Sequence, residues 1–102
     1  MYDKNQIHIT GRVIEVSSFK DKKGEEALNL NVESSNKYSD VIHCTVFGSL
    51  VPSVLEKIRS GDRVIVIGRL MSYLKKESNV SSFRVIVEKI GLEIEGDVRG
   101  SE

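Results

Sequence analysis

The stretch of sequence that decides the fold is Val41–Leu70, VIHCTVFGSLVPSVLEKIRSGDRVIVIGRL. In its first part, residues 41–47, side chains alternate between two faces as in a β-strand, and the alternation returns over residues 64–73. Between them, apolar residues recur at the spacing of a helix with one buried face. The stretch therefore predicts a strand, a helix and a second strand.

The predicted helix has signals at both ends. Ser49 is a candidate N-cap, Pro52 is tolerated because it falls in the first turn, and Gly61 is a candidate stop. Its buried stripe is expected to consist of Leu50 or Val51, Val54, Leu55 and Ile58. A single apolar stripe fits a helix that closes the bottom of a barrel.

Three further alternating segments flank this stretch. The predicted strands are, in chain order, residues 5–16, 28–33, 41–47, 64–73 and 83–89, the last extended if Leu92 and Ile94 continue it past Gly91. Gly11 suggests a bend or bulge in the first strand, and residues 75–82 are expected to form a hairpin loop. Phe83 has the parity of Val85 and Val87, which favours a place in the core.

Five strands with one helix between the third and fourth follow the element order of the OB-fold, a small, partly open barrel. We therefore predict an all-β protein with one helix. Its 102 residues suit a single domain, expected over residues 1–95, followed by a short, acidic and flexible tail over 96–102. Apolar residues make up 39% and charged residues 29% of the chain, which argues against a disordered or fibrous protein.

The single cysteine and the length of the apolar segments indicate in which cellular compartment the protein is expected. Cys44 is the single cysteine, so no intrachain disulfide can form, and this fits a reducing, cytoplasmic environment. No apolar run is long enough to span a membrane, and no secretory signal opens the sequence. We therefore expect no membrane partner.

The sequence argues against an enzyme. Cys44 and His43 are neighbours on a predicted strand, so their side chains point to opposite faces and cannot form a nucleophile and base pair. No glycine-rich phosphate loop and no carboxylate pair at metal-ligand spacing is present. Neither a cofactor nor a metal site is predicted.

Charge is balanced overall but unevenly placed. The formal net charge is +0, and residues 91–102 hold acidic side chains opposed by Arg99 alone, which leaves a mild basic excess in the rest of the chain. Lysines cluster in two predicted loops, at residues 20–23 and 75–76. These clusters suit either phosphate contacts or ordinary solvated loops.

Three stretches resemble the bacterial single-stranded DNA-binding protein family: Asn5–Val13 (NQIHITGRV), Val46–Leu50 (VFGSL) and Ser60–Leu70 (SGDRVIVIGRL). The resemblance implies an OB-fold that binds single-stranded DNA without sequence preference and protects it during replication, repair and recombination. It also implies a homotetramer, with a dimer as the fallback, in the cytoplasm or nucleoid of a bacterium or encoded by a phage or plasmid. The edge-capable strand at 5–10 is free of charge and proline, which favours self-association.

The chain departs from the family in its aromatic residues. The family stacks bases on tryptophans, and this sequence contains none. Tyr38, Val41 and the run Tyr73–Leu74–Lys75 stand in the regions where the family commonly has them. The family's linker and acidic, Phe-terminated tip are also missing from the printed sequence, which weakens the expectation of recruited replication or recombination proteins.

The predicted nucleic-acid surface is the outer face of the third and fourth strands with their nearby loops. Phe47 ends its strand before Gly48, so its ring either offers a stacking platform or packs into the barrel rim. Arg69, Tyr73 and Lys75 share one face by parity and mix cations with an aromatic ring. The predicted binding residues are Phe47, Arg69, Tyr73, Lys75, His43, Arg12, Tyr38, Lys76 and Arg84, the last two with a solvated surface role as the alternative.

A second hypothesis assigns the chain to a different functional class, that of protein-interaction modules. The chain also suits an oligomeric OB-fold interaction module related to primosomal replication proteins, in which nucleic-acid binding is secondary. The absence of tryptophan favours this module, whereas the basic stripe with Phe47 favours DNA binding. Both alternatives stay open at the level of sequence.

Overall fold

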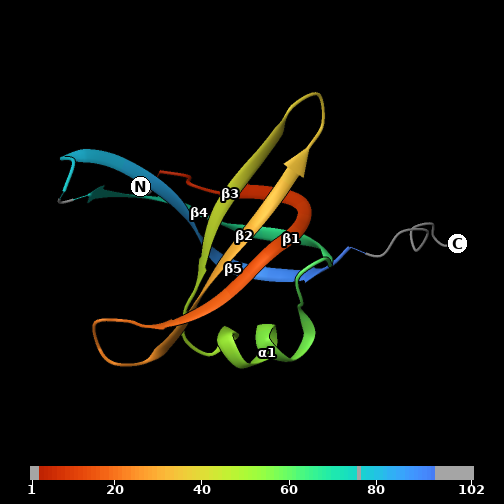
Figure 1. Ribbon diagram of the computed structural model, residues 1–102, viewed down its shortest axis with the longest axis horizontal. Coiled ribbons are helices and arrows are strands. Elements are labelled where there is room, and N and C mark those ends of the chain that lie inside the picture. The colour runs from red at the N-terminus through yellow and green to blue at the C-terminus, as the bar shows by residue number, and fades with distance from the viewer. Residues whose placement is uncertain (1–2, 76, 94–102) are drawn as a thin grey trace, which may run out of the picture.

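The computed structural model describes residues 3–75 and 77–93, so Lys76, Ile94 and the predicted tail lie outside the described residues. The elements are, in order, β1 (Ile7–Lys20), β2 (Glu26–Ser35), β3 (Ser39–Val46), α1 (Leu50–Lys57), β4 (Arg63–Lys75) and β5 (Val80–Leu92). This is the predicted order, with the helix between the third and fourth strands (Figure 1).

The strands form a closed barrel in the order β1-β2-β3-β5-β4, with β4 returning to β1. Neighbouring strands are antiparallel except β3 and β5, which run parallel and pair only at Cys44 with Val85 and Thr45 with Ile86. Closure leaves the central part of the sheet without an exposed edge. The predicted five-stranded OB barrel is therefore confirmed.

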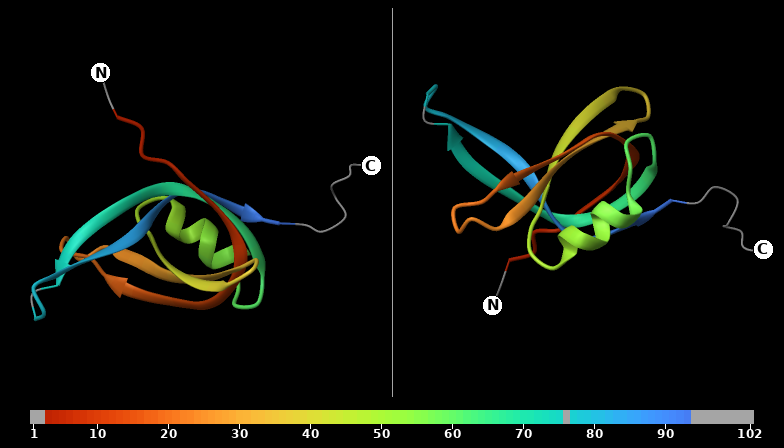
Figure 2. Two further views of the ribbon diagram at one scale, coloured as in Figure 1. Left: turned by 90° about the horizontal axis from the view of Figure 1, so that it is seen from above. Right: turned by 60° about the horizontal axis from the view of Figure 1, so that its bottom comes forward.

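The strands are longer than the sequence predicts because their hairpins continue beyond the barrel. β1 starts at Ile7 and runs to Lys20, so it covers residues that the sequence suggests as a loop. β4 continues to Lys75 and β5 starts at Val80, so residues 75 and 80–82 of the predicted hairpin loop belong to the strands. We call the projecting part of this hairpin, residues 69–75 and 80–86, the β4–β5 arm. It and the β1–β2 hairpin project from the same side of the barrel in both views of Figure 2.

The bulge in β1 lies after the expected position. Val13 pairs with Val32 and Glu15 with Asn31, so Ile14 is the extra residue of β1. Gly11 serves a different purpose: a Cβ there would overlap the carbonyl oxygen of Glu33, so only glycine permits the close approach of the strands. The bulge reverses which side chains of β1 face outward from Glu15 onward.

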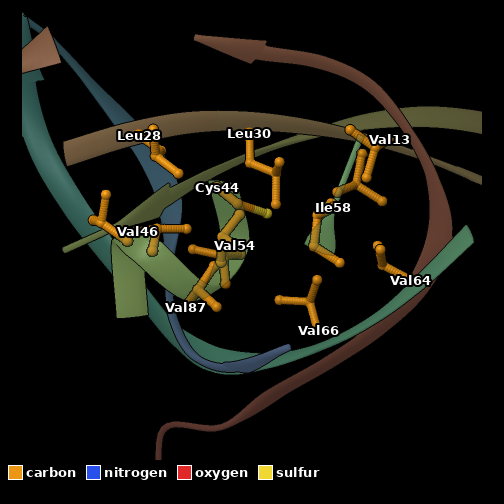
Figure 3. Packing of buried hydrophobic residues seen from close by; sticks show 13 residues of the cluster. Val13, Leu28, Leu30, Cys44, Val46, Val54, Ile58, Val64, Val66 and Val87 are labelled. Carbon is orange, nitrogen blue, oxygen red and sulfur yellow. The ribbon is translucent and has the colours of Figure 1, made fainter. Parts of the chain in front are cut away.

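The core fills the barrel from its strands and from the helix below. Thirteen apolar residues from all six elements form one buried cluster. Figure 3 shows Val54 and Ile58 reaching from the helix region toward Cys44 and the strand side chains. Burying so much apolar surface is the main stabilising contribution to the fold.

Parts of the predicted helix are wrong. Leu55 is 45% exposed, because the buried stripe is carried by Val51, Val54 and Ile58 alone. Ser49 occupies the N-cap position without a side-chain hydrogen bond, and the helix ends at Lys57, before Gly61. Gly61 instead adopts a φ of 99°, and its N–H donates to the carbonyl of Val13 at 2.7 Å, which ties the turn to β1.

The expectation of a buried Phe83 is also wrong. The parity was correct, since Val85 and Val87 are buried, but Phe83 is 58% exposed. It lies on the arm, opposite Ser72 and beyond the end of the barrel, where there is no core to enter. The arm therefore exposes apolar residues on the face that would otherwise continue the barrel interior.

Candidate nucleic-acid interface

The outer face of β1, β2 and β3 is arranged in rows by the strand register. Glu15, Asn31 and His43 form one row. The next row toward the β1–β2 hairpin contains Ser17, Asn29 and Thr45. The row after that pairs Phe19 with Ala27, and Phe47 follows β3 on the same side. The surface thus changes from polar to aromatic toward the hairpin.

Phe47 and Phe19 form an aromatic pair across β2. Their ring centroids are 6.5 Å apart and the planes are inclined by 78°, an edge-to-face contact. Phe47 keeps 41% of its surface exposed, whereas Ala27, the small residue opposite Phe19, is fully buried. Phe47 therefore rests on an aromatic support and still offers surface to a ligand.

Arg84 of β5 is held at the centre of this face. One of its guanidinium nitrogens, Nη1, donates to Oδ1 of Asn29 at 2.9 Å and to Oγ1 of Thr45. The same guanidinium lies 5.3 Å from the ring centroid of Tyr73, within the range of a cation–π contact. Thr45 is only 1% exposed, so Arg84 supplies a donor to an otherwise buried hydroxyl. The contact links β2, β3, β4 and β5.

The same cation changes the acidity of Tyr73. A side-chain hydrogen bond with Arg84 lowers the pKa of the Tyr73 phenol from its ordinary value of 10.0, and the positive charges of Arg84 and Lys75 act in the same direction. The phenol is at the protein surface, where a ligand can reach it. Arg84 therefore both orients and polarises the aromatic side chain beside it.

A groove of about 330 Å³ runs between the arm and the aromatic pair. Its lining residues are Phe19, Asn29, Thr45, Phe47, Met71, Tyr73 and Arg84. A smaller polar pocket of about 190 Å³ adjoins it, shares Asn29 and Arg84, and includes His43. His43 is bonded through Nδ1 to Oδ1 of Asn31 at 2.9 Å, and Asn31 in turn donates to Glu15.

The structure brings some of the sequence-predicted residues together. Phe47, Tyr73 and Arg84 line the groove, and His43 lines the adjoining pocket. Arg69 and Lys75 have the parity of Tyr73 on β4 and lie toward the two ends of the arm. All of them except Phe47, which directly follows β3, lie within strands.

Other predicted residues lie apart from the groove. Arg12 precedes the bulge and pairs with Glu33 and Arg63, beyond the row of His43. Tyr38 is 70% exposed in the β2–β3 hairpin, which points away from the arm (Figure 1), and its ring contacts the ammonium of Lys37 at 5.9 Å. Lys76 lies outside the described residues.

Sequence reasoning missed four groove residues: Phe19, Asn29, Thr45 as a partner of Arg84, and Met71. Met71 shares the parity of Tyr73, so its outward position was available from the pattern. Phe19 was hidden because the bulge at Ile14 reverses the alternation before it. The only sequence signal was a large aromatic residue within an apparently polar segment.

Cys44 and His43 lie on opposite faces of β3. Cys44 is fully buried in the core, and burial raises the pKa of its thiol to about 11, an effect that the positive charge of Arg84 partly offsets. His43 is exposed on the outer face. The two side chains therefore cannot act together as a nucleophile and a base.

Comparison with protein families identifies this architecture. The model of the single-strand binding protein family matches residues 4–93. The chain belongs to the single-strand binding protein family. The family is named for binding single strands, and aromatic and cationic side chains on one outer face suit such a ligand. Within the residues that the structure describes, no helix has the length and apolar character needed to cross a membrane.

Solved structures share the fold. A mitochondrial single-stranded DNA-binding protein from S. cerevisiae superimposes with a TM-score of 0.77 at 20% identity, over 88% of this chain and 96% of the other. The N-terminal domain of PriB from Thermoanaerobacter tencongensis, described as dimeric, gives a TM-score of 0.71 at 21% identity, over 89% of this chain and 98% of the other. A comparison with curated proteins finds no match.

Proposed function

We propose that this protein binds single-stranded DNA without sequence preference through the groove beside the β4–β5 arm, and protects it during replication, repair and recombination. The observation that carries the proposal is the convergence of Phe47, Tyr73 and Arg84 on one groove of a family member. Every base has a face that can stack on an aromatic ring, so such contacts tolerate any sequence.

Charge on the arm supports the same ligand. Its two strands carry Arg69, Lys75 and Arg84, and residues 69–75 and 80–86 contain no carboxylate. Cations next to aromatic rings allow phosphates to be neutralised while bases stack. With no tryptophan in the chain, phosphate contacts carry a larger share of the affinity than stacking does.

The test of the proposal is Phe47→Ala, measured by anisotropy with a labelled oligo-dT of several dozen nucleotides. Loss of one stacking platform weakens binding by about 1–3 kcal/mol. Leu55→Ala is the matched control, because Leu55 is exposed to a similar extent, 45% against 41%, but lies on α1. Wild-type affinity in Phe47→Ala, or equal losses in both variants, would show that the groove is not the binding surface.

We further propose that the chain assembles as a homotetramer, with a dimer as the fallback. Leu70, Leu74 and Phe83 are 40%, 59% and 58% exposed on the face of the arm that points away from the groove. Contiguous exposed apolar side chains favour a protein contact. The edge of β4 that pairs with β1 has no further pairs with that strand beyond Gly68. At this point the side chain of Asn5 bonds both the N–H and the carbonyl of Leu70.

Sedimentation equilibrium at micromolar concentration tests assembly. The expected mass is a multiple of the 11.4 kDa chain, and Leu74→Arg is expected to lower it. A mass near that of the single chain for the wild-type protein would contradict both the tetramer and the dimer.

The same apolar face favours one second function, an interaction module similar to primosomal replication proteins. In that function the arm binds a replication or recombination protein, and nucleic acid is a secondary ligand. A gel shift with the same oligo-dT separates the two functions. Absence of a shift at micromolar protein would favour the interaction module, whereas a shift that Phe47→Ala weakens would favour DNA binding.

A further inference from the structure

A second hollow borders Phe47 on the side of the β1–β2 hairpin. A larger surface pocket of about 620 Å³ lies between the aromatic pair and the β1–β2 hairpin, and its walls include Phe19, Phe47 and Lys20, Lys22 and Lys23. Phe19 and Phe47 also line the groove beside the arm. The two hollows therefore border the same aromatic pair.

The hairpin that borders this pocket is held in a defined turn. Oδ1 of Asp21 accepts hydrogen bonds from the backbone N–H groups of Lys23 and Glu25, both at 2.9 Å. Gly24 adopts a φ of 82° and donates its N–H to the carbonyl of Asp21. The turn fixes the backbone from which the lysine side chains extend.

The charge of the pocket is positive. Its lining includes three lysines against the carboxylates of Asp21 and Glu25. One oxygen of Asp21 is already occupied by two backbone donors. The three ammonium groups are exposed, so they remain available to an anionic ligand. An apolar corner next to exposed cations suits a nucleotide, which has a flat base and a charged phosphate.

The aromatic pair has the geometry of a corner rather than a stack. Because the rings of Phe19 and Phe47 are inclined by 78°, a flat base that stacks on one ring meets the edge of the other. Phe19 faces outward only because Ile14 is an extra residue in β1. The bulge thus gives the chain a second aromatic face in the absence of tryptophan.

We propose that Phe19 is a second base-stacking platform and that Lys20, Lys22 and Lys23 contact the phosphates beside that base. The bound strand then runs from the β4–β5 arm across Phe47 to the β1–β2 hairpin. This inference rests on the proposed binding of single-stranded DNA and assigns to the hairpin a part of the ligand that the arm does not reach.

A tryptophan placed at the site reports stacking directly. The chain contains no tryptophan, so Phe19→Trp introduces one indole as the only source of tryptophan fluorescence. Saturation with oligo-dT is expected to quench the tryptophan fluorescence, because a base stacked on the indole quenches its excited state. Leu55→Trp on α1 is the control, and its fluorescence is expected to stay unchanged.

Affinity separates a platform from a mere support for Phe47. Phe19→Leu keeps an apolar side chain beneath Phe47 but removes the aromatic face, and is expected to weaken oligo-dT binding by about 5- to 150-fold. Phe19→Tyr is expected to restore the wild-type Kd. Changing Lys22 and Lys23 to Ala is expected to reduce the salt slope by about 1.4, unlike Lys57→Ala on the helix.

The outcomes separate the inference from the function on which it rests. Failure of the wild-type protein to bind oligo-dT would refute both. Binding that Phe47→Ala weakens, together with wild-type affinity in Phe19→Leu and an unquenched Phe19→Trp, would refute the inference alone. Circular dichroism of each variant confirms that the barrel is folded before the titration.

Discussion

Arg84 offers a test of how the groove is preorganised. We choose Arg84→Met, which keeps a long apolar stem but removes the charge and its donors. Thr45 is 1% exposed and would lose the donor to its hydroxyl, a cost of about 1–3 kcal/mol. Loss of the contact with the Tyr73 ring adds about 0.5–1 kcal/mol. We therefore expect the free energy of unfolding to fall by about 1.5–4 kcal/mol.

A double-mutant cycle with Thr45→Val isolates the buried contact. In the valine background there is no hydroxyl to leave without a partner, so Arg84→Met is expected to cost about 1–3 kcal/mol less than in the wild type. Urea unfolding followed by circular dichroism measures all four proteins, since tryptophan fluorescence is not available. A coupling energy below about 0.5 kcal/mol would refute the view that Arg84 is anchored through Thr45.

Two further predictions concern charge. Arg69→Ala and Lys75→Ala should each reduce the dependence of log K on log salt by about 0.7, with most of the lost affinity at low salt, and unchanged slopes in titrations at several salt concentrations would remove these residues from the phosphate path. For Cys44, the folded-state pKa of about 11 lies above the ordinary 9.0, so the unfolded chain loses the thiol proton first and stability falls as pH rises from about 9 to 11. Relative to Cys44→Ala, the wild type should lose about 2 kcal/mol between pH 8 and pH 10.5 in urea unfolding, and a constant difference would show that the thiol does not titrate as the burial implies.

The barrel was predictable from the sequence because a single helical segment interrupts the alternating pattern of the strands. Alternation on both sides of the helical segment at Leu50 defined the order of the elements, and a lone apolar stripe suggested the position of the helix. The exposure of Leu55 and Phe83 could not be predicted in this way. Period gives the face on which a residue lies, whereas burial depends on how far the covering elements extend.

The residues of the candidate site were predictable where their position depends on the alternation along a single strand. Phe47 and Tyr73 were found from parity and from their neighbours. The bonds of Arg84 to β2 and β3 depend on β5 lying next to β3, a neighbour that is not next in sequence. Phe19 depends on one extra residue in the ladder, which alternation alone does not reveal.

The parallel β3–β5 seam has a consequence for the kinetics of folding. It joins only two residue pairs from segments far apart in the chain, whereas the other ladders are longer and antiparallel. Closing the seam costs loop entropy, as closing the β1–β4 ladder does, but only two residue pairs offset that cost. The groove lies across this seam, with Phe47 on one side and Tyr73 on the other. A DNA strand that contacts both residues, as we propose, is therefore expected to slow opening of the barrel and to prolong the lifetime of the folded protein.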